Sequence, residues 1–188
     1  MIPPHEAAWE VHEFLTRAGL RYAIIGGVAI QHWGEPRLTV DLDVTVAVPL
    51  DQAEGLVRAL VERFTPRHAD PVGFARQTRV VPVRAANGCP VDISLAVPGY
   101  EDEMMARAVD YEIEPGRIVR LASAEDLIVH KAVAGRPLDL KDIAGIVYRR
   151  REALDVAYIR RWLREFASAL DMPEILDRFE QPWGRIRP

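Results

Sequence analysis

Two aspartates that alternate along one short stretch are the residues of this chain best suited to chemistry. In the run 40–46, Asp41 and Asp43 are separated by a single apolar residue. Side chains of a β-strand alternate between its two faces, so both carboxylates should lie on one face. Strands are poor in aspartate and like charges repel, which favours a hard divalent cation with oxygen ligands. The run therefore predicts a metal site, and the alternative is a solvated edge strand with incidental charges.

A third carboxylate comes from a later predicted strand. The Asn-Gly pair at 87–88 is a strong hairpin signal, and it leads into a predicted strand at 91–95. Asp92 is the acidic residue of that otherwise apolar strand. A hairpin that returned it beside the first two carboxylates would complete a metal cage. The alternative is an aspartate on an exposed strand face.

A glycine pair precedes the first aspartate by thirteen residues. Gly26 and Gly27 follow a predicted buried strand at 22–25 and precede a short predicted helix at 28–33. Backbone N–H groups at such a helix start are unpaired and can bind an anion. The pair is a weak signal alone, but beside the aspartates it predicts a phosphate site.

One lysine stands out because basic residues are almost all arginine. Only Lys131 and Lys141 are lysines among 24 basic residues. Lys131 falls within the apolar stripe of a helix that should begin with Ser123 as its N-cap. A lysine there must reach an anion or extend to solvent. We favour an anion, nucleotide phosphate, over a packing role.

The elements that must position these residues indicate an α+β fold, a small mixed β-sheet flanked by helices with a helical carboxy-terminal part. We expect helices at 4–18, 51–64, 101–110, 138–148 and 155–170 and a short one from 173, strands at 41–48, 77–84 and 118–121, and a loop at 65–75. Residues 1–122 would form a catalytic core, and residues 123–188 a helical region packed on it.

Composition limits the classes of protein. The 188 residues, 49% hydrophobic, can bury a real core, and the single Cys89 rules out an internal disulfide framework. We expect a protein of the reducing cytoplasm with no membrane span, since no apolar run reaches about 18 residues. The net charge of -4 argues against nucleic-acid binding by bulk electrostatics. The arginine clusters 149–151 and 160–161 could still contact a phosphate backbone.

Three strand carboxylates, a glycine turn and a later lysine together predict metal-assisted nucleotidyl transfer. Two Mg²⁺ ions held by Asp41 and Asp43, with Asp92 on one of them, would bridge a nucleoside triphosphate and an attacking hydroxyl. One ion would lower the pKa of the hydroxyl, and the other would neutralise charge on the leaving pyrophosphate.

These motifs resemble a known superfamily. Gly26-Gly27 followed by Asp41-Leu42-Asp43, with Asp92 on a later strand, resembles the signature of the DNA polymerase beta-like nucleotidyltransferases. The run GGVAIQHWGEPRLTVDLD at 26–43 and the segment EDLIVHKAVAGR at 125–136 are similar to the AbiEii-type toxins of bacterial type IV toxin–antitoxin systems. The resemblance covers roughly residues 22 to 145.

The resemblance implies roles for individual residues. Metal ligation falls to Asp41, Asp43 and Asp92, the last also as base, and nucleotide binding to Gly26, Gly27, Arg37, Thr39, Lys131 and Arg136. Asp139 or Asp142 would orient Lys131 or the sugar, and a capping or salt-bridge role is an equal alternative. Two departures matter, because Gly27 stands where many members have serine, and the chain is shorter than many AbiEii-type toxins.

The implied function is transfer of a nucleoside monophosphate from an NTP to an acceptor hydroxyl, namely an RNA 3′ end such as that of tRNA, with an antitoxin protein as partner. A second reading is an aminoglycoside-type nucleotidyltransferase, in which the acidic helix starting at Glu101 would help to bind a cationic drug. A third is a protein-modifying or inactive interaction partner. The sequence leaves the acceptor, the base preference and the oligomeric state open.

Overall fold

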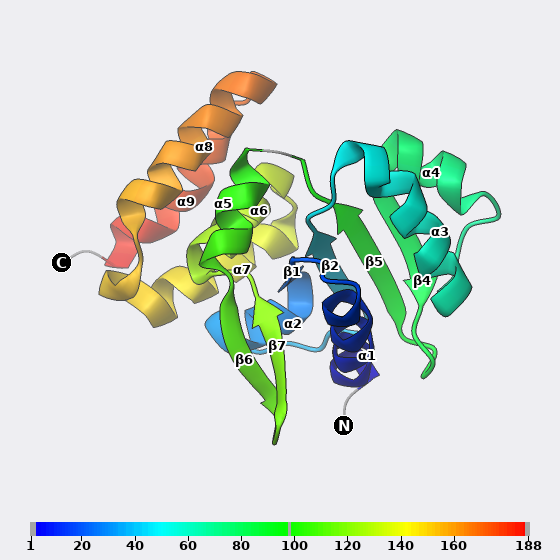
Figure 1. Ribbon diagram of the computed structural model, residues 1–188. Helices are drawn as coiled ribbons and strands as arrows, with labels where there is room; N and C mark the ends of the chain where they lie inside the picture. The colour runs from blue at the N-terminus through cyan, green and yellow to red at the C-terminus, as the bar shows by residue number, and fades with distance from the viewer. Residues whose placement is uncertain (1–2, 98, 187–188) are drawn as a thin grey trace. The chain divides into compact units, whose positions relative to one another are not determined.

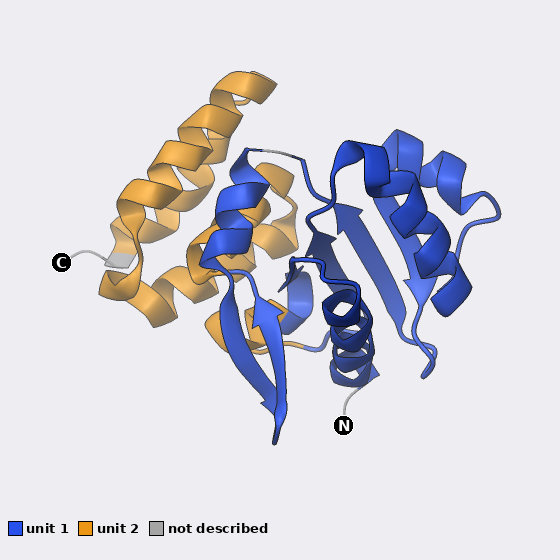
Figure 2. Ribbon diagram, in the orientation of Figure 1, with its two compact units in different colours: residues 1–28, 38–122 blue, residues 29–37, 123–188 orange. Residues whose placement is uncertain are grey.

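The computed structural model describes residues 3–97 and 99–186, which form two compact units (Figures 1 and 2). One unit holds the chain up to Val28 together with Leu38–Ala122, drawn in blue in Figure 2. The other, in orange, holds Ala29–Arg37 and the chain from Ser123 onward. Residues 29–37 belong to the same unit as the carboxy-terminal helices.

The first unit is built on one mixed sheet of seven strands in the order β3-β4-β5-β2-β1-β7-β6. Its strands are β1 (Tyr22–Ile25), β2 (Leu42–Val46), β3 (Thr65–Pro66), β4 (Val80–Arg84), β5 (Pro90–Leu95), β6 (Val109–Glu114) and β7 (Arg117–Leu121). Its helices are α1 (Pro3–Arg17), the 3-10 turn η1 (Leu50–Gln52), α3 (Ala53–Arg63), α4 (Pro71–Thr78) and α5 (Tyr100–Arg107). The predicted α+β class is confirmed.

The two faces of the central strands differ in polarity. Ile24, Val44, Ile93 and Val81 are register partners across β1, β2, β5 and β4, and each is at most 1% exposed. Their face is apolar and buried, so it forms part of the core, to which α1 and α3 also contribute buried side chains. The residues one position along each strand point to the opposite face. That face carries the aspartates.

Helix α4 corrects the prediction of a loop over 65–75. Asp70 caps the helix by accepting a hydrogen bond from the Gly73 backbone N–H at 2.9 Å, and Pro71 occupies the first helical position, where proline is favoured. Pro71 and Gly73, which are typical of loops, lie in the first turn of this helix, whereas Pro66 lies in β3. Strand β4 begins at Val80 rather than at residue 77.

A strand was missed between α5 and β7. Residues 109–114 form β6, which pairs antiparallel with β7 through a turn at Gly116, whose φ is +76°. The prediction extended the acidic helix to residue 110, but α5 ends at Arg107. In this edge strand the apolar residues Val109, Tyr111 and Ile113 alternate with acidic residues, of which Asp110 and Glu112 are exposed. That period of two is a strand signal, and the prediction of a helix to residue 110 overrode it.

The second unit is helical. It contains α6 (Ala124–Ala134), α7 (Pro137–Arg150), η2 (Arg151–Ala153), α8 (Val156–Leu170) and α9 (Glu174–Ile186), and α2 (Gly26–Trp33) runs from the first unit into the second. Ser123 caps α6 by accepting from the Asp126 N–H, as predicted. Helix α9 is longer than expected, because Pro182 lies inside it without ending it. Within the described ranges, no helix is long and apolar enough to cross a membrane.

Candidate active site

Asp43 and Asp92 are neighbours on adjacent strands. Strands β2 and β5 are parallel, and the two aspartates are register partners within that ladder. Register partners share a face of the sheet, so both carboxylates lie on the polar face, where both residues are half-buried. Placed side by side, the two like charges repel and favour a cationic partner. The third carboxylate predicted from the hairpin is thus brought beside the aspartate run.

Gly26 makes room for one of these carboxylates. A Cβ at Gly26 would lie 1.9 Å from Oδ2 of Asp43, closer than any side chain allows, and its φ is +64°, a conformation that favours glycine. The Asp43 carboxylate therefore lies directly against the backbone at the first residue of α2. The glycine is required for this close approach as well as for the turn between β1 and α2.

The second glycine faces a threonine. A Cβ at Gly27 would lie 2.2 Å from Oγ1 of Thr39. The same Oγ1 donates a hydrogen bond to Oδ1 of Asp41 at 3.1 Å, and Thr39 is buried. Gly27, Thr39 and Asp41 thus form a second contact set beside the helix start.

An arginine that the sequence analysis did not select contacts the third carboxylate. Nη1 of Arg67 lies 2.8 Å from Oδ1 of Asp92, with the two side chains 29% and 40% exposed. Arg67 follows the edge strand β3, and its backbone N–H donates to the carbonyl of Pro82. No local pattern could have found it, because 25 residues separate the partners.

A threonine on the same strand as Asp43 was also missed. Thr45 is fully buried, and its Oγ1 has no hydrogen-bond partner within the described chain. Two residues after Asp43, it lies on the same face of β2, so the alternation that selected the aspartates extends to it. A buried hydroxyl without a partner is costly and retains its capacity to bind.

The carboxylates of this site are the type of ligand that a hard divalent cation binds. Carboxylate oxygens are the ligands that Mg²⁺ prefers, and the gap at Gly26 lets one carboxylate reach the helix start. Within residues 3–97 and 99–186, however, no group of three acidic, histidine or cysteine side chains converges as a metal cage. The geometry supports the in-register pair Asp43 and Asp92, with Asp41 held by Thr39 close by.

Lys131 has anionic partners within its own unit. Its Nζ lies 2.7 Å from Oδ1 of Asp139 and 2.9 Å from Oδ2 of Asp142, and all three side chains are at most 9% exposed. The lysine in the apolar stripe therefore reaches two buried carboxylates. The anions seen are carboxylates, and the predicted contact with nucleotide phosphate stays a prediction.

Two arginines complete this buried ion cluster. Arg37 binds Asp142 through two hydrogen bonds, of 3.0 and 3.1 Å, and Nε of Arg136 lies 2.6 Å from Oδ2 of Asp139. Burial raises the pKa of Asp139, but hydrogen bonds from Arg136 and Lys131 outweigh it and hold that pKa below its usual value. Asp139 also accepts from the Arg136 backbone N–H, so it caps α7. The salt-bridge and capping alternatives for these aspartates are both realised.

Most of the arginines considered for RNA binding are engaged within the helical unit. Arg160 forms two hydrogen bonds with Glu180, at 2.6 and 2.9 Å, and Arg149 donates to the carbonyl of Gly34. The guanidinium carbon of Arg150 lies 4.9 Å from the centroid of the Trp33 ring. Arg161 lies over Trp162 at 5.0 Å and over Tyr158 at 5.3 Å. These contacts reduce the basic surface that the clusters would offer.

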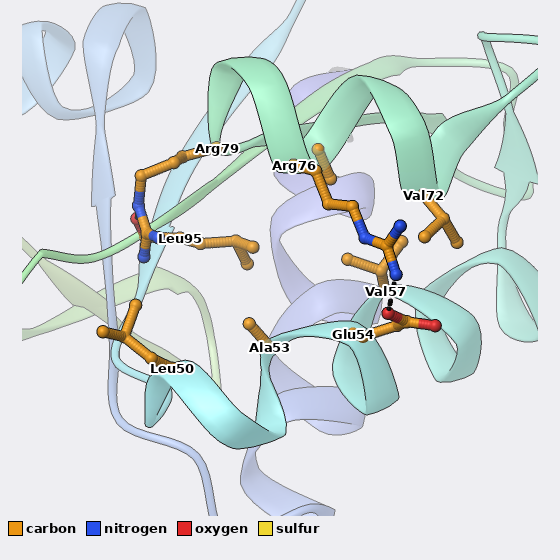
Figure 3. Close-up of a pocket in the computed structure, with 9 residues that line it drawn as sticks. Leu50, Ala53, Glu54, Val57, Val72, Arg76, Arg79 and Leu95 are labelled. Atoms are coloured by element: carbon orange, nitrogen blue, oxygen red, sulfur yellow. Dashed lines mark hydrogen bonds and ion pairs between the residues drawn. The ribbon is translucent and has the colours of Figure 1, made fainter.

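A pocket of about 240 Å³ lies elsewhere in the first unit (Figure 3). Its walls come from η1, α3, α4 and the end of β5, and Arg76 and Glu54 point toward one another across it as an ion pair. Leu95, in its lining, has the strand parity of Ile93, so it belongs to the apolar face of β5. The pocket is therefore separate from the Asp43–Asp92 pair on the other face.

Comparison with known proteins identifies the fold. No family model and no curated protein matches the chain. A nucleotidyltransferase-like protein from Paracoccidioides brasiliensis superposes with a TM-score of 0.57 at 18% identity, covering 94% of this chain and 93% of that one. The antibiotic-resistance factor ANT(2'')-Ia superposes with a TM-score of 0.60 at 19% identity, covering 90% of this chain and 96% of that one. The lincosamide antibiotic adenylyltransferase LnuA superposes with a TM-score of 0.51 at 10% identity, covering 75% of this chain and 94% of that one. The chain has the nucleotidyltransferase fold.

Proposed function

We propose that this chain is a nucleotidyltransferase that transfers a nucleoside monophosphate from an NTP to an acceptor hydroxyl. The observation that carries the proposal is the in-register pair Asp43 and Asp92, with Asp43 set against Gly26 at the start of α2. The shared fold with the nucleotidyltransferase-like structures supports it. A carboxylate pair beside the N–H groups of a helix start suits a ligand that combines a cation with phosphate.

A task can be proposed for each candidate site residue of the first unit. Mg²⁺ held by Asp43 and Asp92, with Asp41, would neutralise charge on the triphosphate and lower the pKa of the attacking hydroxyl. Gly26 and Gly27 would present backbone N–H groups to phosphate oxygens. Asp92 would accept the proton of the acceptor hydroxyl. The hydrogen bond from Thr39 holds the Asp41 carboxylate in place.

We propose a small polar molecule as the acceptor. Two structures with this fold, both matched over more than nine-tenths of their length, are an antibiotic-resistance factor and a lincosamide antibiotic adenylyltransferase. The engagement of Arg149, Arg150 and Arg160 with other groups of the protein also favours a small acceptor over a nucleic-acid backbone. The acceptor class would be a hydroxylated antibiotic, of the aminoglycoside or lincosamide type.

An RNA 3′ end is the second candidate acceptor, and one feature favours it. Arg161 is exposed and its guanidinium lies over the ring of half-buried Trp162, a pairing of cation and aromatic side chain that suits stacking of unpaired bases. This version keeps the toxin activity and the antitoxin partner inferred from the sequence resemblance. It predicts growth arrest on expression, whereas the antibiotic version predicts drug resistance.

The test is a transfer assay with each of the four α-phosphate-labelled NTPs and Mg²⁺. Acceptors are a panel of aminoglycosides and lincosamides, total RNA, and the protein itself. We expect label on a drug and none when Asp43→Asn replaces the wild type. Label on RNA alone would move the assignment to the second candidate. Label on protein alone would favour the protein-modifying reading, and no transfer to any acceptor would refute the proposal.

A further inference from the structure

Arg67 places a positive charge beside Asp92 from the β4 side of the sheet, whereas Asp43 lies on the other side, on β2. Its guanidinium makes one contact, from Nη1 to Oδ1 of Asp92, at 2.8 Å. The backbone of Arg67 is fixed to the sheet by its hydrogen bond to Pro82, which is the register partner of Asp92 on β4. Arg67 therefore reaches from the sheet edge, past β4, to the carboxylate on β5. The contact lies on the polar face.

We propose that Arg67 is a functional part of the carboxylate site. In the metal-free protein its guanidinium neutralises Asp92, and a divalent cation that binds Asp43 and Asp92 displaces it from Oδ1. Arg67 thus sets the affinity of the site for the cation. This inference rests on the proposed function, since it assumes that the two aspartates bind metal.

The geometry of the pair suits exchange. Both side chains are partly open to solvent, at 29% and 40% exposed, and the contact is single rather than bidentate. Exposed pairs of this kind are weak and screened by salt. The pair of Arg37 with Asp142 differs on both counts, because it has two hydrogen bonds and an aspartate that is 3% exposed. Arg67 can leave its carboxylate at little cost.

The position of the Arg67–Asp92 pair explains why an arginine would alternate with a divalent cation at this site. Asp92 lies in register with Asp43, so two carboxylates would repel across the ladder in the absence of a cation. Arg67 offsets that repulsion. A divalent ion carries twice the charge and can contact both carboxylates, so it competes successfully once present. The same positive charge that stabilises the empty site weakens the binding of the ion.

The decisive variant is Arg67→Ala. Removing the competing charge should raise the affinity for Mn²⁺, used as a probe for Mg²⁺, by roughly three- to tenfold at low ionic strength. The gain should shrink as salt is added. Binding is measured by calorimetry and by water-proton relaxation, neither of which depends on turnover.

Three further variants make the result specific. Arg58→Ala removes an exposed arginine that is paired with Glu54 on α3, and it should leave Mn²⁺ affinity unchanged. Asp43→Asn should weaken binding by at least tenfold. In an Asp92→Asn background, Arg67→Ala should have no further effect, because the two residues act through one contact. If Arg67→Ala fails to fold by circular dichroism, Arg67→Gln replaces it.

The outcomes separate this inference from the proposed function. Binding that depends on Asp43 but is unchanged by loss of the Arg67 charge would overturn the role of Arg67 and leave the metal assignment intact. Binding that is absent, or that is insensitive to Asp43→Asn and Asp92→Asn, would overturn the metal assignment itself and this inference with it.

Discussion

Two groups of carboxylates in this molecule contrast in how completely they are neutralised. Asp139 and Asp142 in the helical unit are 1% and 3% exposed and are surrounded by Lys131 and two arginines. Asp92 on the sheet is 40% exposed, has one contact with a partly exposed arginine, and stands beside Asp43. Buried charges must be paired to be tolerated, whereas exposed charges on a sheet face can remain available. The first group is neutralised within its unit, whereas the second keeps a partly exposed carboxylate on the sheet.

The largest effect should come from Asp43→Asn. It removes one charge of the ligand pair and should lower nucleotidyl transfer on the order of a thousandfold, about 4 kcal/mol in transition-state stabilisation. Because repulsion with Asp92 is relieved, unfolding free energy should change by less than about 0.5 kcal/mol. Transfer assays and thermal denaturation of the same preparation check both. A variant that loses activity only because it unfolds would contradict the contrast.

Lys131→Met should mainly affect stability, in contrast to Asp43→Asn, which should mainly affect activity. It leaves two buried carboxylates with fewer cations, so it should lower the unfolding free energy by about 3 kcal/mol. Lys141→Met, at the other lysine, is the control and should cost little, because that side chain is exposed. Urea denaturation measures both. Normal stability with weakened NTP binding would show instead that Lys131 serves the nucleotide, as first predicted.

Gly26→Ala tests whether the sheet site depends on close packing of its carboxylate. The new Cβ would clash with Oδ2 of Asp43 and would adopt a φ of +64°, so we expect a loss of about 2 kcal/mol in stability and weaker Mn²⁺ binding. Gly19→Ala is a matched control, with φ +67° and nothing within 4 Å of its Cβ. It should cost about 1 kcal/mol from strain and leave Mn²⁺ binding unchanged. Equal effects of both substitutions would show that the contact with Asp43 is unimportant.

The smallest effect concerns pH and the helical unit. Burial, and then the adjacent charge of Lys131, lowers the pKa of His130 to about 4. The unfolded chain takes up a proton near pH 6.5, so the stabilisation due to neutral His130 is present above that pH and is lost progressively as the pH falls toward 4. We expect a loss of about 1–2 kcal/mol across this window, and His130→Gln should flatten it. Denaturation at a series of pH values measures the slope. An unchanged slope in the variant would assign the acid sensitivity to other groups.

Much of the fold followed from local pattern. The period of two in the aspartate run, the Asn-Gly turn and the cap at Ser123 each describe interactions within a few residues, and the structure confirms the corresponding elements. Errors arose where local signals conflicted. The proline and glycine after Asp70 suggested a loop but belong to a capped helix. The acidic residues of β6 suggested a continuation of the preceding acidic helix, although they alternate with apolar residues as a strand requires.

The candidate site also combines features that local sequence indicates with features that only tertiary packing decides. By itself, the sequence indicated which side chains could bind metal and phosphate, because alternation along a strand is a local property. The strand itself begins at Leu42, so Asp43 lies within it, whereas Thr39 and Asp41 precede it. Only the tertiary structure decided that Asp92 stands in register with Asp43, that Arg67 contacts Asp92, and that Lys131 pairs with two aspartates. Periodicity fixes the direction of a side chain but not its neighbour across the fold. Pairing between strands and helices distant in sequence depends on the packing of the whole chain.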